Sequence, residues 1–478
     1  MKFKIFLTFI FLFLIQPPSY SKLYEFSDLG FENSFNDFLK NKDREIQLEK
    51  EITDFLDEEQ IPVSLDECLD VALQNNFNIK AKFETYKSYD YMYKNSLTKF
   101  LPNFLYSFYS IYYGGQVLVG TALVDNFNEL ALSSMISIEH NLTNGGKDIF
   151  NAKVKRFEKM QSRENLGFQQ DEVIMNTSIY YYQLLESKIN IEIHIKNLYE
   201  RIIQLKLTEN LENTGMGTKF DVIRQKSEVA NAKRNLVEAV NEFRLRQAKL
   251  SNIMGIEITT SLYPIEKEAN IYNLVDDDIN MNILYETALK NRKDIKAMED
   301  KIQALINERR EIYTSFIPSA KFVYRHQNQG TSKEGMENAN VVGLYVNFEL
   351  GENLILGTTT KAKAKTCEIN SYKTDLEIKK REIKEKLLDS YYNSRLLLKR
   401  TEITKERVNY ATESVKLAEM RLDSGIGILV DVIQAQGEKT DAKIEYLQAV
   451  IEYNINQIEL LFDEGIISID SVIKNYNP

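Results

Sequence analysis

The stretch NTGMGTKFDVIRQ (Asn213–Gln225) has a near copy, DSGIGILVDVIQAQ (Asp423–Gln436), and this pair decides the fold. In each stretch Asp-Val-Ile begins four residues after the second glycine of a Gly-x-Gly, and the two motifs lie 210 residues apart. The same spacing aligns two further pairs, Tyr181-Tyr182 with Tyr391-Tyr392 and Gly255-Ile256 with Gly465-Ile466. Matches that keep one order over this distance indicate an internal duplication.

A second spacing, of 216 residues, relates the beginnings of the two copies. It aligns ALQNNFNIKA (72–81) with ALKNRKDIKA (288–297), and it places Pro102 and Pro318 at equivalent positions. The duplication predicts four parts after the N-terminal region: a first structural repeat at 63–256, a linker at 257–280, a second structural repeat at 281–466 and a C-terminal tail at 467–478.

The first 21 residues predict a secretory signal peptide, followed by an N-terminal extension at 22–62 with no assigned role. Lys2 and Lys4 precede an apolar run at 5–15, and Ser19 and Ser21 supply small residues before the expected cleavage site. A transmembrane anchor is the weaker interpretation, because this run is shorter than the ~20 residues that span a bilayer.

Each repeat predicts a helix, a strand pair, a long helix, a glycine turn and a final helix. The first helix, at about 65–99, should begin with a capping box at Ser64–Glu67. Pro102 and Pro318 cannot continue a helix, so they mark helix-to-strand transitions. Alternating residues then predict strands at 103–113 and 320–326, with return strands at 132–142 and 342–350.

The four expected strands fit two interpretations. Apolar and polar side chains alternate along them, as in a transmembrane barrel, but a soluble hairpin packed on helices has the same local pattern. Four strands cannot close a barrel, since about eight are needed. Either several chains contribute strands to one barrel or the strands are soluble.

The second helix of the first repeat is predicted over 147–212, which is unusually long. Its apolar residues recur every seven positions, with Thr177 and Lys188 as polar exceptions, and this indicates a coiled coil. Gly215 and Gly217 then form the turn of a helical hairpin, Thr218 caps the next helix and Asp221 lies in its first turn. A phosphate-binding glycine loop is excluded because no strand precedes it and no Lys-Ser/Thr follows.

Composition and scattered histidines argue against two classes of function. The formal net charge of -10 disfavours nucleic acid as a partner. His140, His194 and His326 share no metal-ligand spacing and no nucleophile motif accompanies them, so we expect no catalytic residue, metal or cofactor. Cys68 and Cys367 leave two alternatives open, a disulfide or two unpaired buried thiols.

Together the signal peptide, the duplication, ALxxN early in each repeat, Phe-x-Pro before the strands and the paired GxGxxxDV turns resemble the TolC family of outer membrane efflux proteins. The resemblance covers about 64–466. It implies an α+β membrane protein. Three copies would form a trimeric 12-stranded β-barrel, with four strands per chain, continued by a long α-helical coiled-coil periplasmic barrel.

The resemblance also implies a function and a location. The homotrimer would lie in the outer membrane with a large periplasmic portion, as the passive exit duct of a tripartite efflux or type I secretion system. Its partners would be a periplasmic adaptor (membrane fusion) protein and an inner-membrane pump of the RND or ABC type. The cargo would be small toxic compounds or secreted proteins. The alternative is an exported coiled-coil structural or adhesin-like surface protein, which would not explain the strands or the repeated glycine turn.

By motif position, the resemblance assigns site residues to the two hairpin tips. Asp221 and Asp431 would lie at the periplasmic entrance and select cations, with Gln434 where some members of the family carry a second acid. Whether these aspartates select ions or only cap helices is open. Gly427 stands where a long cationic side chain can latch the tip, so that latch is missing. The residues expected to contact the adaptor are Gly215, Met216, Gly217, Gly425, Ile426 and Gly427.

Overall fold

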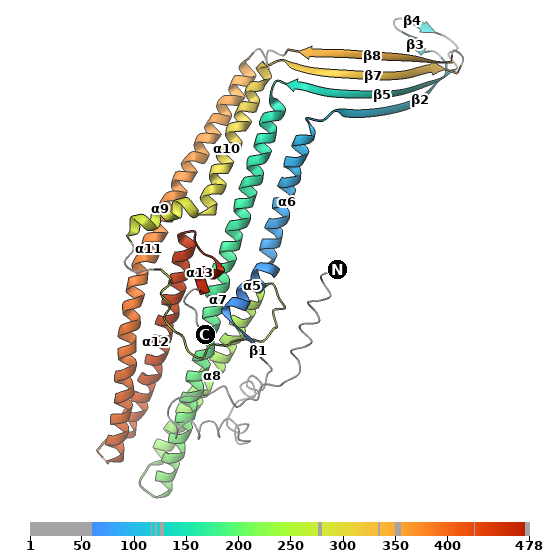
Figure 1. Cartoon of the computed structure of the whole chain (residues 1–478). Coiled ribbons are helices and arrows are strands. Elements are labelled where there is room, and N and C mark those ends of the chain that lie inside the picture. Colours follow the sequence, from blue (N-terminus) through green and yellow to red (C-terminus); the bar gives the residue numbers. More distant parts are fainter. Residues whose placement is uncertain are drawn as a thin grey trace.

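The computed structural model describes residues 60–115, 117–119, 122–124, 129–275, 280–332, 335–348, 355–424 and 426–473. The expected signal peptide, most of the N-terminal extension, Gly425 and the last residues of the C-terminal tail lie outside these ranges. The molecule is elongated, with a sheet at one end and the turns of two helical hairpins at the other (Figure 1). None of the described helices has the length and apolar character that crossing a bilayer requires.

The first repeat contains the expected order of elements. They are β1 (Ile61–Val63), α5 (Leu65–Asn75), α6 (Phe77–Thr98), β2 (Asn103–Tyr113), the short strands β3 (Val117–Val119) and β4 (Ala122–Val124), β5 (Glu129–Asn144), α7 (Lys147–Asn213) and α8 (Lys219–Met254). The capping box of Ser64 and Glu67 is confirmed. The β3–β4 hairpin was not predicted.

The single first helix predicted at 65–99 is wrong, because the chain breaks at Asn76 into α5 and α6. The Asn76 side chain is the reason: its Oδ1 accepts hydrogen bonds from the backbone N–H of Asn78 (2.8 Å) and Ile79 (3.2 Å). An asparagine that caps a new helix in this way competes with continuation of the old one. The sequence pattern did not reveal this break, because the residues on both sides of Asn76 follow a helical pattern.

The second repeat follows the same order after the linker. The linker contains β6 (Leu262–Pro264). The second repeat contains α9 (Met281–Asn291), α10 (Lys293–Tyr313), the 3-10 turn η2 (Thr314–Phe316), β7 (Ser319–Thr331), β8 (Gly335–Asn347), α11 (Leu356–Asp423) and α12 (Leu429–Asp463), and α13 (Ile469–Ile473) lies in the C-terminal tail. Pro102 lies between α6 and β2, and Pro318 lies between η2 and β7.

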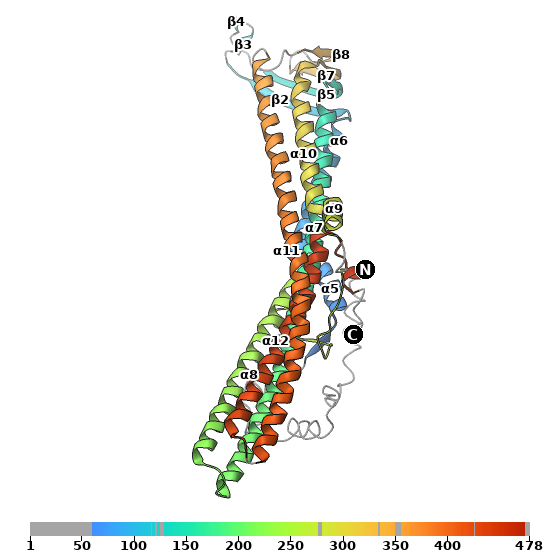
Figure 2. The same cartoon turned by 90° about the vertical axis from the view of Figure 1, so that its left-hand side faces the viewer.

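The four long strands, two from each repeat, join one antiparallel sheet in the order β2-β5-β7-β8, while β1 pairs with β6 and β3 pairs with β4. β5 and β7 pair across the repeat boundary, with Ile136 opposite His326, so neither strand pair stands alone. β2 and β8 are the two edges of this sheet. The view turned by 90° shows the helices continuing from the sheet as a long bundle (Figure 2).

The predicted heptad seam of α7 forms the main core. Its buried members include Ile174, Tyr181, Leu184, Ile191, Ile195, Leu198 and Ile202. Lys188, a polar exception in this seam, is also buried, and its Nζ donates to the backbone carbonyls of Pro264 (3.0 Å) and Glu266 (2.6 Å). The lysine therefore fastens the β6 segment to α7, which explains a charge at a core position.

Glycines at the repeat ends allow a close approach between distant segments. Gly255 and Gly465 have φ of +68° and +70°, a region that disfavours other residues. A Cβ at Gly255 would lie 2.6 Å from the Asn75 carbonyl oxygen, and one at Gly465 would lie 2.8 Å from the Arg292 nitrogen. Each repeat thus packs the end of its last helix on the break in its first.

Glu464, beside this second contact, predicts a pH-dependent stability. Glu464 is 4% exposed, and burial raises the pKa of its carboxyl from 4.5 to about 7. The folded state favours the neutral acid, so ionisation of Glu464 lowers the free energy of unfolding. This loss of stability is absent below pH 4.5, grows as the pH rises to about 7, and is complete above it.

We therefore expect Glu464→Gln to raise the free energy of unfolding by up to about 3 kcal/mol at pH 8, at 1.36 kcal/mol per pKa unit. The gain should vanish near pH 4 in denaturant titrations of both proteins. An equal gain at both pH values would contradict the assignment.

Candidate functional site

The first hairpin tip is a tight turn that requires its two glycines for different reasons. Gly215 has φ +77°, and the Leu211 carbonyl accepts from the N–H groups of Met216 (2.9 Å) and Gly217 (3.0 Å). This arrangement ends a helix through a left-handed residue. At Gly217 a Cβ would lie 3.0 Å from the Glu212 nitrogen, so the second glycine supplies space.

The second tip repeats this geometry. The Arg421 carbonyl accepts from the N–H groups of Ile426 (3.0 Å) and Gly427 (2.8 Å). A Cβ at Gly427 would lie 2.9 Å from the Leu422 nitrogen. Any side chain at 427, including a long cationic one, would therefore displace the backbone of this turn. Gly425 itself is outside the described residues.

The two aspartates beside the tips have different surroundings. Asp221 completes a capping box at the start of α8: its Oδ2 accepts from the Thr218 hydroxyl (2.6 Å) and the Thr218 N–H (3.3 Å), and its own N–H donates to Thr218 Oγ1 (3.2 Å). This carboxylate is held by its own helix terminus.

Asp431 has no such partner, because the equivalent N-cap residue is Ile428, which has no side-chain oxygen. Within the described residues, no hydrogen bond or ion pair holds the exposed Asp431 carboxylate. Gln434, one turn on, donates from Nε2 to Glu438 (3.0 Å). The difference follows from Thr218 and Ile428, so the sequence contained the signal.

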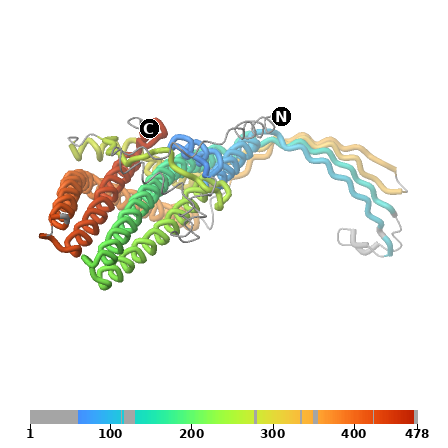
Figure 3. Tube along the Cα trace, turned by 90° about the horizontal axis from the view of Figure 1, so that it is seen from below, coloured from blue at the N-terminus to red at the C-terminus, as the bar shows by residue number. Residues whose placement is uncertain are grey.

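Large apolar side chains are exposed at both tips. Met216 is 79% exposed and Ile426 is 76% exposed, with Phe220 and Ile428 beside them. Exposed apolar residues gathered on turns are typical of a contact surface for another protein. Seen from below, the two hairpins lie side by side, so both tips face the same direction (Figure 3).

A polar contact joins the two hairpins above the tips, and the sequence patterns did not indicate it. Arg201 of α7 is buried and its Nη2 donates to the Ile433 carbonyl of α12 (3.2 Å). Lys439 of α12 pairs with Glu200 of α7 at 3.0 Å. A Cβ on Gly437 would lie 3.9 Å from Arg201 Nη2. A glycine inside a helix, which lowers helix stability, was the available signal for this approach.

The residues with catalytic potential do not converge. His140 lies on β5, His326 on β7 and His194 on α7. In the ranges that the structure describes, no cluster of three His, Cys, Asp or Glu side chains is placed to hold a metal. Cys68 and Cys367 are both free; Cys68 is buried but Cys367 is exposed, so the expectation of two buried thiols holds for Cys68 alone.

Comparisons with known proteins agree with this geometry. The sequence profile of the outer membrane efflux protein family matches residues 284–462, most of the second repeat. A search of curated protein sequences finds no match.

Solved structures with the same fold are outer-membrane channels. The outer-membrane channel OprN aligns with a TM-score of 0.72 and 15% identity, over 88% of this chain and 93% of that one. The Campylobacter jejuni CmeC outer membrane channel aligns with a TM-score of 0.73 and 13% identity, over 88% and 90%. The outer membrane protein VceC from Vibrio cholerae aligns with a TM-score of 0.70 and 15% identity, over 84% and 96%. Residues 284–462 therefore match the outer membrane efflux protein family, and the chain as a whole shares the fold of solved outer-membrane channels.

Proposed function

We propose that this protein is an outer-membrane exit duct, a homotrimer that conducts small toxic compounds or secreted proteins from a periplasmic adaptor and an inner-membrane pump to the exterior. The proposal rests on the different surfaces at the two ends of the molecule. A sheet whose two edge strands are unpaired on one side within the described residues lies at one end, and two helical hairpins with exposed apolar tips lie at the other (Figure 1).

The free edges of the sheet support assembly of several copies. β2 and β8 each have one side without a pairing strand within the described residues. Unpaired backbone N–H and C=O groups at the edge of a sheet are costly, above all in lipid. Pairing β8 of one copy with β2 of the next would give these groups hydrogen-bond partners. Three copies with four strands each would close a twelve-stranded barrel, and alternating exposed side chains of β8 (Val342, Leu344 and Val346) would contact lipid.

A second surface supports the same assembly in the helical part. Leu396, Ile403, Tyr410 and Leu417 recur every seven residues on α11 and are all exposed. Such a seam normally packs against another helix. In the proposed trimer a helix of the neighbouring copy would cover this seam and extend the coiled-coil wall of the periplasmic tunnel.

The hairpin tips would form the periplasmic entrance and the contact with the adaptor. Exposed Met216 and Ile426 supply apolar area for that contact. In a trimer the Asp431 carboxylates would form a ring, and a ring of free acids favours cations. Asp221 would contribute less, because its carboxylate caps α8. Contacts of Arg201 and Lys439 between α7 and α12 would hold the entrance narrow without a latch at Gly427.

Conductance through planar lipid bilayers tests the duct and its selectivity together. The purified protein should form cation-preferring channels, and Asp431→Asn should lower the ratio of cation to anion permeability, because it removes one unpaired charge per copy.

Asp221→Asn is the matched control and should lower that ratio less, because the Asp221 carboxylate is held at the start of α8. Equal loss of selectivity in both variants would contradict the assignment of the entrance to Asp431. Absence of any channel, together with unaltered export of toxic compounds in a deletion strain, would overturn the duct.

A further inference from the structure

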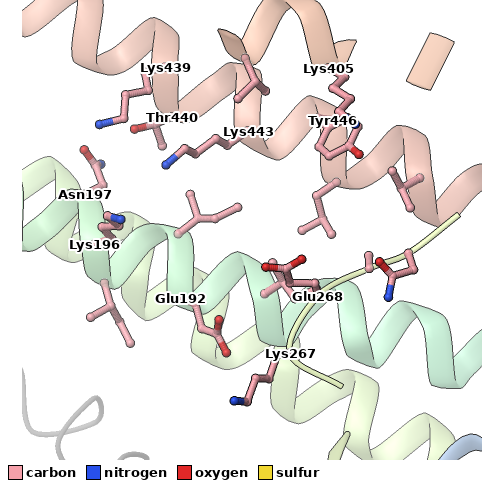
Figure 4. Close-up of a pocket in the computed structure, with 18 of the residues that line it drawn as sticks. Glu192, Lys196, Asn197, Lys267, Glu268, Lys405, Lys439, Thr440, Lys443 and Tyr446 are labelled. Atoms are coloured by element: carbon pink, nitrogen blue, oxygen red, sulfur yellow. The ribbon is translucent and has the colours of Figure 1, made fainter. Parts of the chain in front are cut away.

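A cavity of about 600 Å³ lies between the two hairpins, well away from the tips. It is enclosed by α7, α12, one turn of α11 and the linker segment 267–270 (Figure 4). Its apolar wall includes Ile189, Ile193, Val408, Leu447 and Val450. The volume falls in the range of small-molecule sites, which are mostly apolar with a few polar groups that orient the ligand.

One end of this cavity is rich in lysine. Lys439 and Lys443 of α12 face Lys196 and Asn197 of α7 there (Figure 4). The ion pair between Lys439 and Glu200 neutralises one of these cations. Within the described residues, Lys443 has no hydrogen bond or ion pair, and Glu200 is the nearby acid that offsets part of its charge. Burial, together with the neighbouring Lys439 and Lys196, lowers the pKa of Lys443 to about 8.

A polar atom at the same end also lacks a partner. Oδ1 of Asn197 is buried without a hydrogen bond. Rotating this amide by 180° would present its NH₂ group instead, because the two orientations of an amide have nearly the same shape. An anion at this end would therefore meet the Lys443 ammonium group and, with the amide rotated, an amide donor in place of the unpartnered Oδ1.

Of the three acidic lining residues, Glu200 lies at the lysine end and is paired with Lys439, whereas the other two lie away from it. Glu192 and Glu268 are placed further along the cavity, with Lys267 beside them (Figure 4). Burial raises the pKa of Glu192 to about 7, so this carboxyl is partly neutral at physiological pH. The charges of the cavity thus favour an anionic group at the Lys443 end.

We propose that this cavity binds an acidic amphiphile of the fatty-acid type, with its carboxylate at Lys443 and Asn197 and its hydrocarbon chain along the apolar wall. Such a ligand contacts both α7 and α12 and so stabilises the packing of one hairpin on the other. The residues that would hold the carboxylate, Lys443 and Asn197, lie outside the tips and the sheet, so binding can be tested separately from the channel function.

Calorimetric titration of the full-length protein in amphipol with dodecanoate tests the proposal. Wild-type protein should bind dodecanoate, whereas acetate, which lacks the chain, and dodecanol, which lacks the charge, should bind at least about tenfold more weakly, since each loses one of the two contributions. Acetate or dodecanol binding as tightly as dodecanoate would overturn the acidic amphiphile as the ligand.

Variants locate the carboxylate. Lys443→Met should weaken dodecanoate binding about tenfold or more, as expected for loss of a charge-assisted hydrogen bond, and Lys443→Arg should retain most of it. Lys416→Met is the matched control, because Lys416 is exposed on α11 outside the cavity and its loss should change nothing.

The ligand-free thermal stability of each variant separates misfolding from loss of the site. A Lys443→Met protein with wild-type stability and wild-type affinity would overturn the assignment.

Discussion

Replacing Arg292 with Met is expected to lower the free energy of unfolding by about 3–5 kcal/mol, the usual cost of breaking a buried ion pair from one side. The Arg292 side chain is 5% exposed. Its Nη1 contacts Oδ1 of Asp463 (3.3 Å) and the Asp463 carbonyl (3.2 Å), while its Nε and Nη2 donate to Asp294 (3.0 and 2.9 Å). Methionine would leave Asp463 with the Ser390 hydroxyl as its side-chain donor and Asp294 with the more distant Lys379 (3.6 Å), so both carboxylates would lose their guanidinium partner.

The position of Arg292 explains why the effect should be large. It occupies the break between α9 and α10 and reaches the last residue of α12, so it joins the beginning of the second repeat to its end. Denaturant unfolding followed by circular dichroism would measure the loss.

Arg234→Met is the matched control for this prediction, because Arg234 forms an exposed pair with Glu238 four residues away on one helix. Removing such a surface pair should change stability by less than about 1 kcal/mol. A second variant, Arg292→Met with Asp463→Asn, should recover part of the loss because it removes one uncompensated charge. Equal stability of Arg292→Met and the control would show that the buried network contributes little.

Introducing an aspartate into the exposed seam of α11 is expected to abolish assembly of the proposed trimer. In Ile403→Asp and Tyr410→Asp the new carboxylate would be buried between copies, where an unpaired charge costs several kcal/mol in each of three interfaces. The fold of one copy should survive, since both side chains are exposed within it. Native mass spectrometry of the detergent-solubilised protein would report the number of copies.

The control for the seam is Asn409→Asp, which adds the same charge to an exposed position of α11 next to the seam residue Tyr410 but on another side of the helix. This variant should remain trimeric and conduct ions. Trimers formed normally by Ile403→Asp would mean that the seam faces solvent, and the arrangement of copies would have to differ from the one proposed.

Local rules predicted the features that depend on a few neighbouring residues. The capping box at Ser64, the strands after Pro102 and Pro318, and the turns at Gly215 and Gly217 follow from backbone preferences of short segments. The break at Asn76 was missed because this capping residue interrupts the helical pattern at a single position.

The candidate sites were less predictable because their parts are distant in the chain. The seven-residue spacing placed Lys188 in the core of α7 but did not indicate its partners, which lie 76 and 78 residues away in the linker. The cavity beside Lys443 combines three helices and the linker, and no motif relates them.

By itself, the sequence determined the duplication, the long heptad helices and the two glycine turns, because periodicity and glycine conformation act over one to a few helical turns. Whether residues at matching positions of the two repeats have the same kind of partner depends on the tertiary structure. Asn76 and Arg292 occupy matching breaks, yet one is satisfied by a helix terminus and the other by two buried acids. The reason is physical: duplication repeats the backbone path, whereas the partners of a side chain are set by what packs against it from elsewhere in the chain.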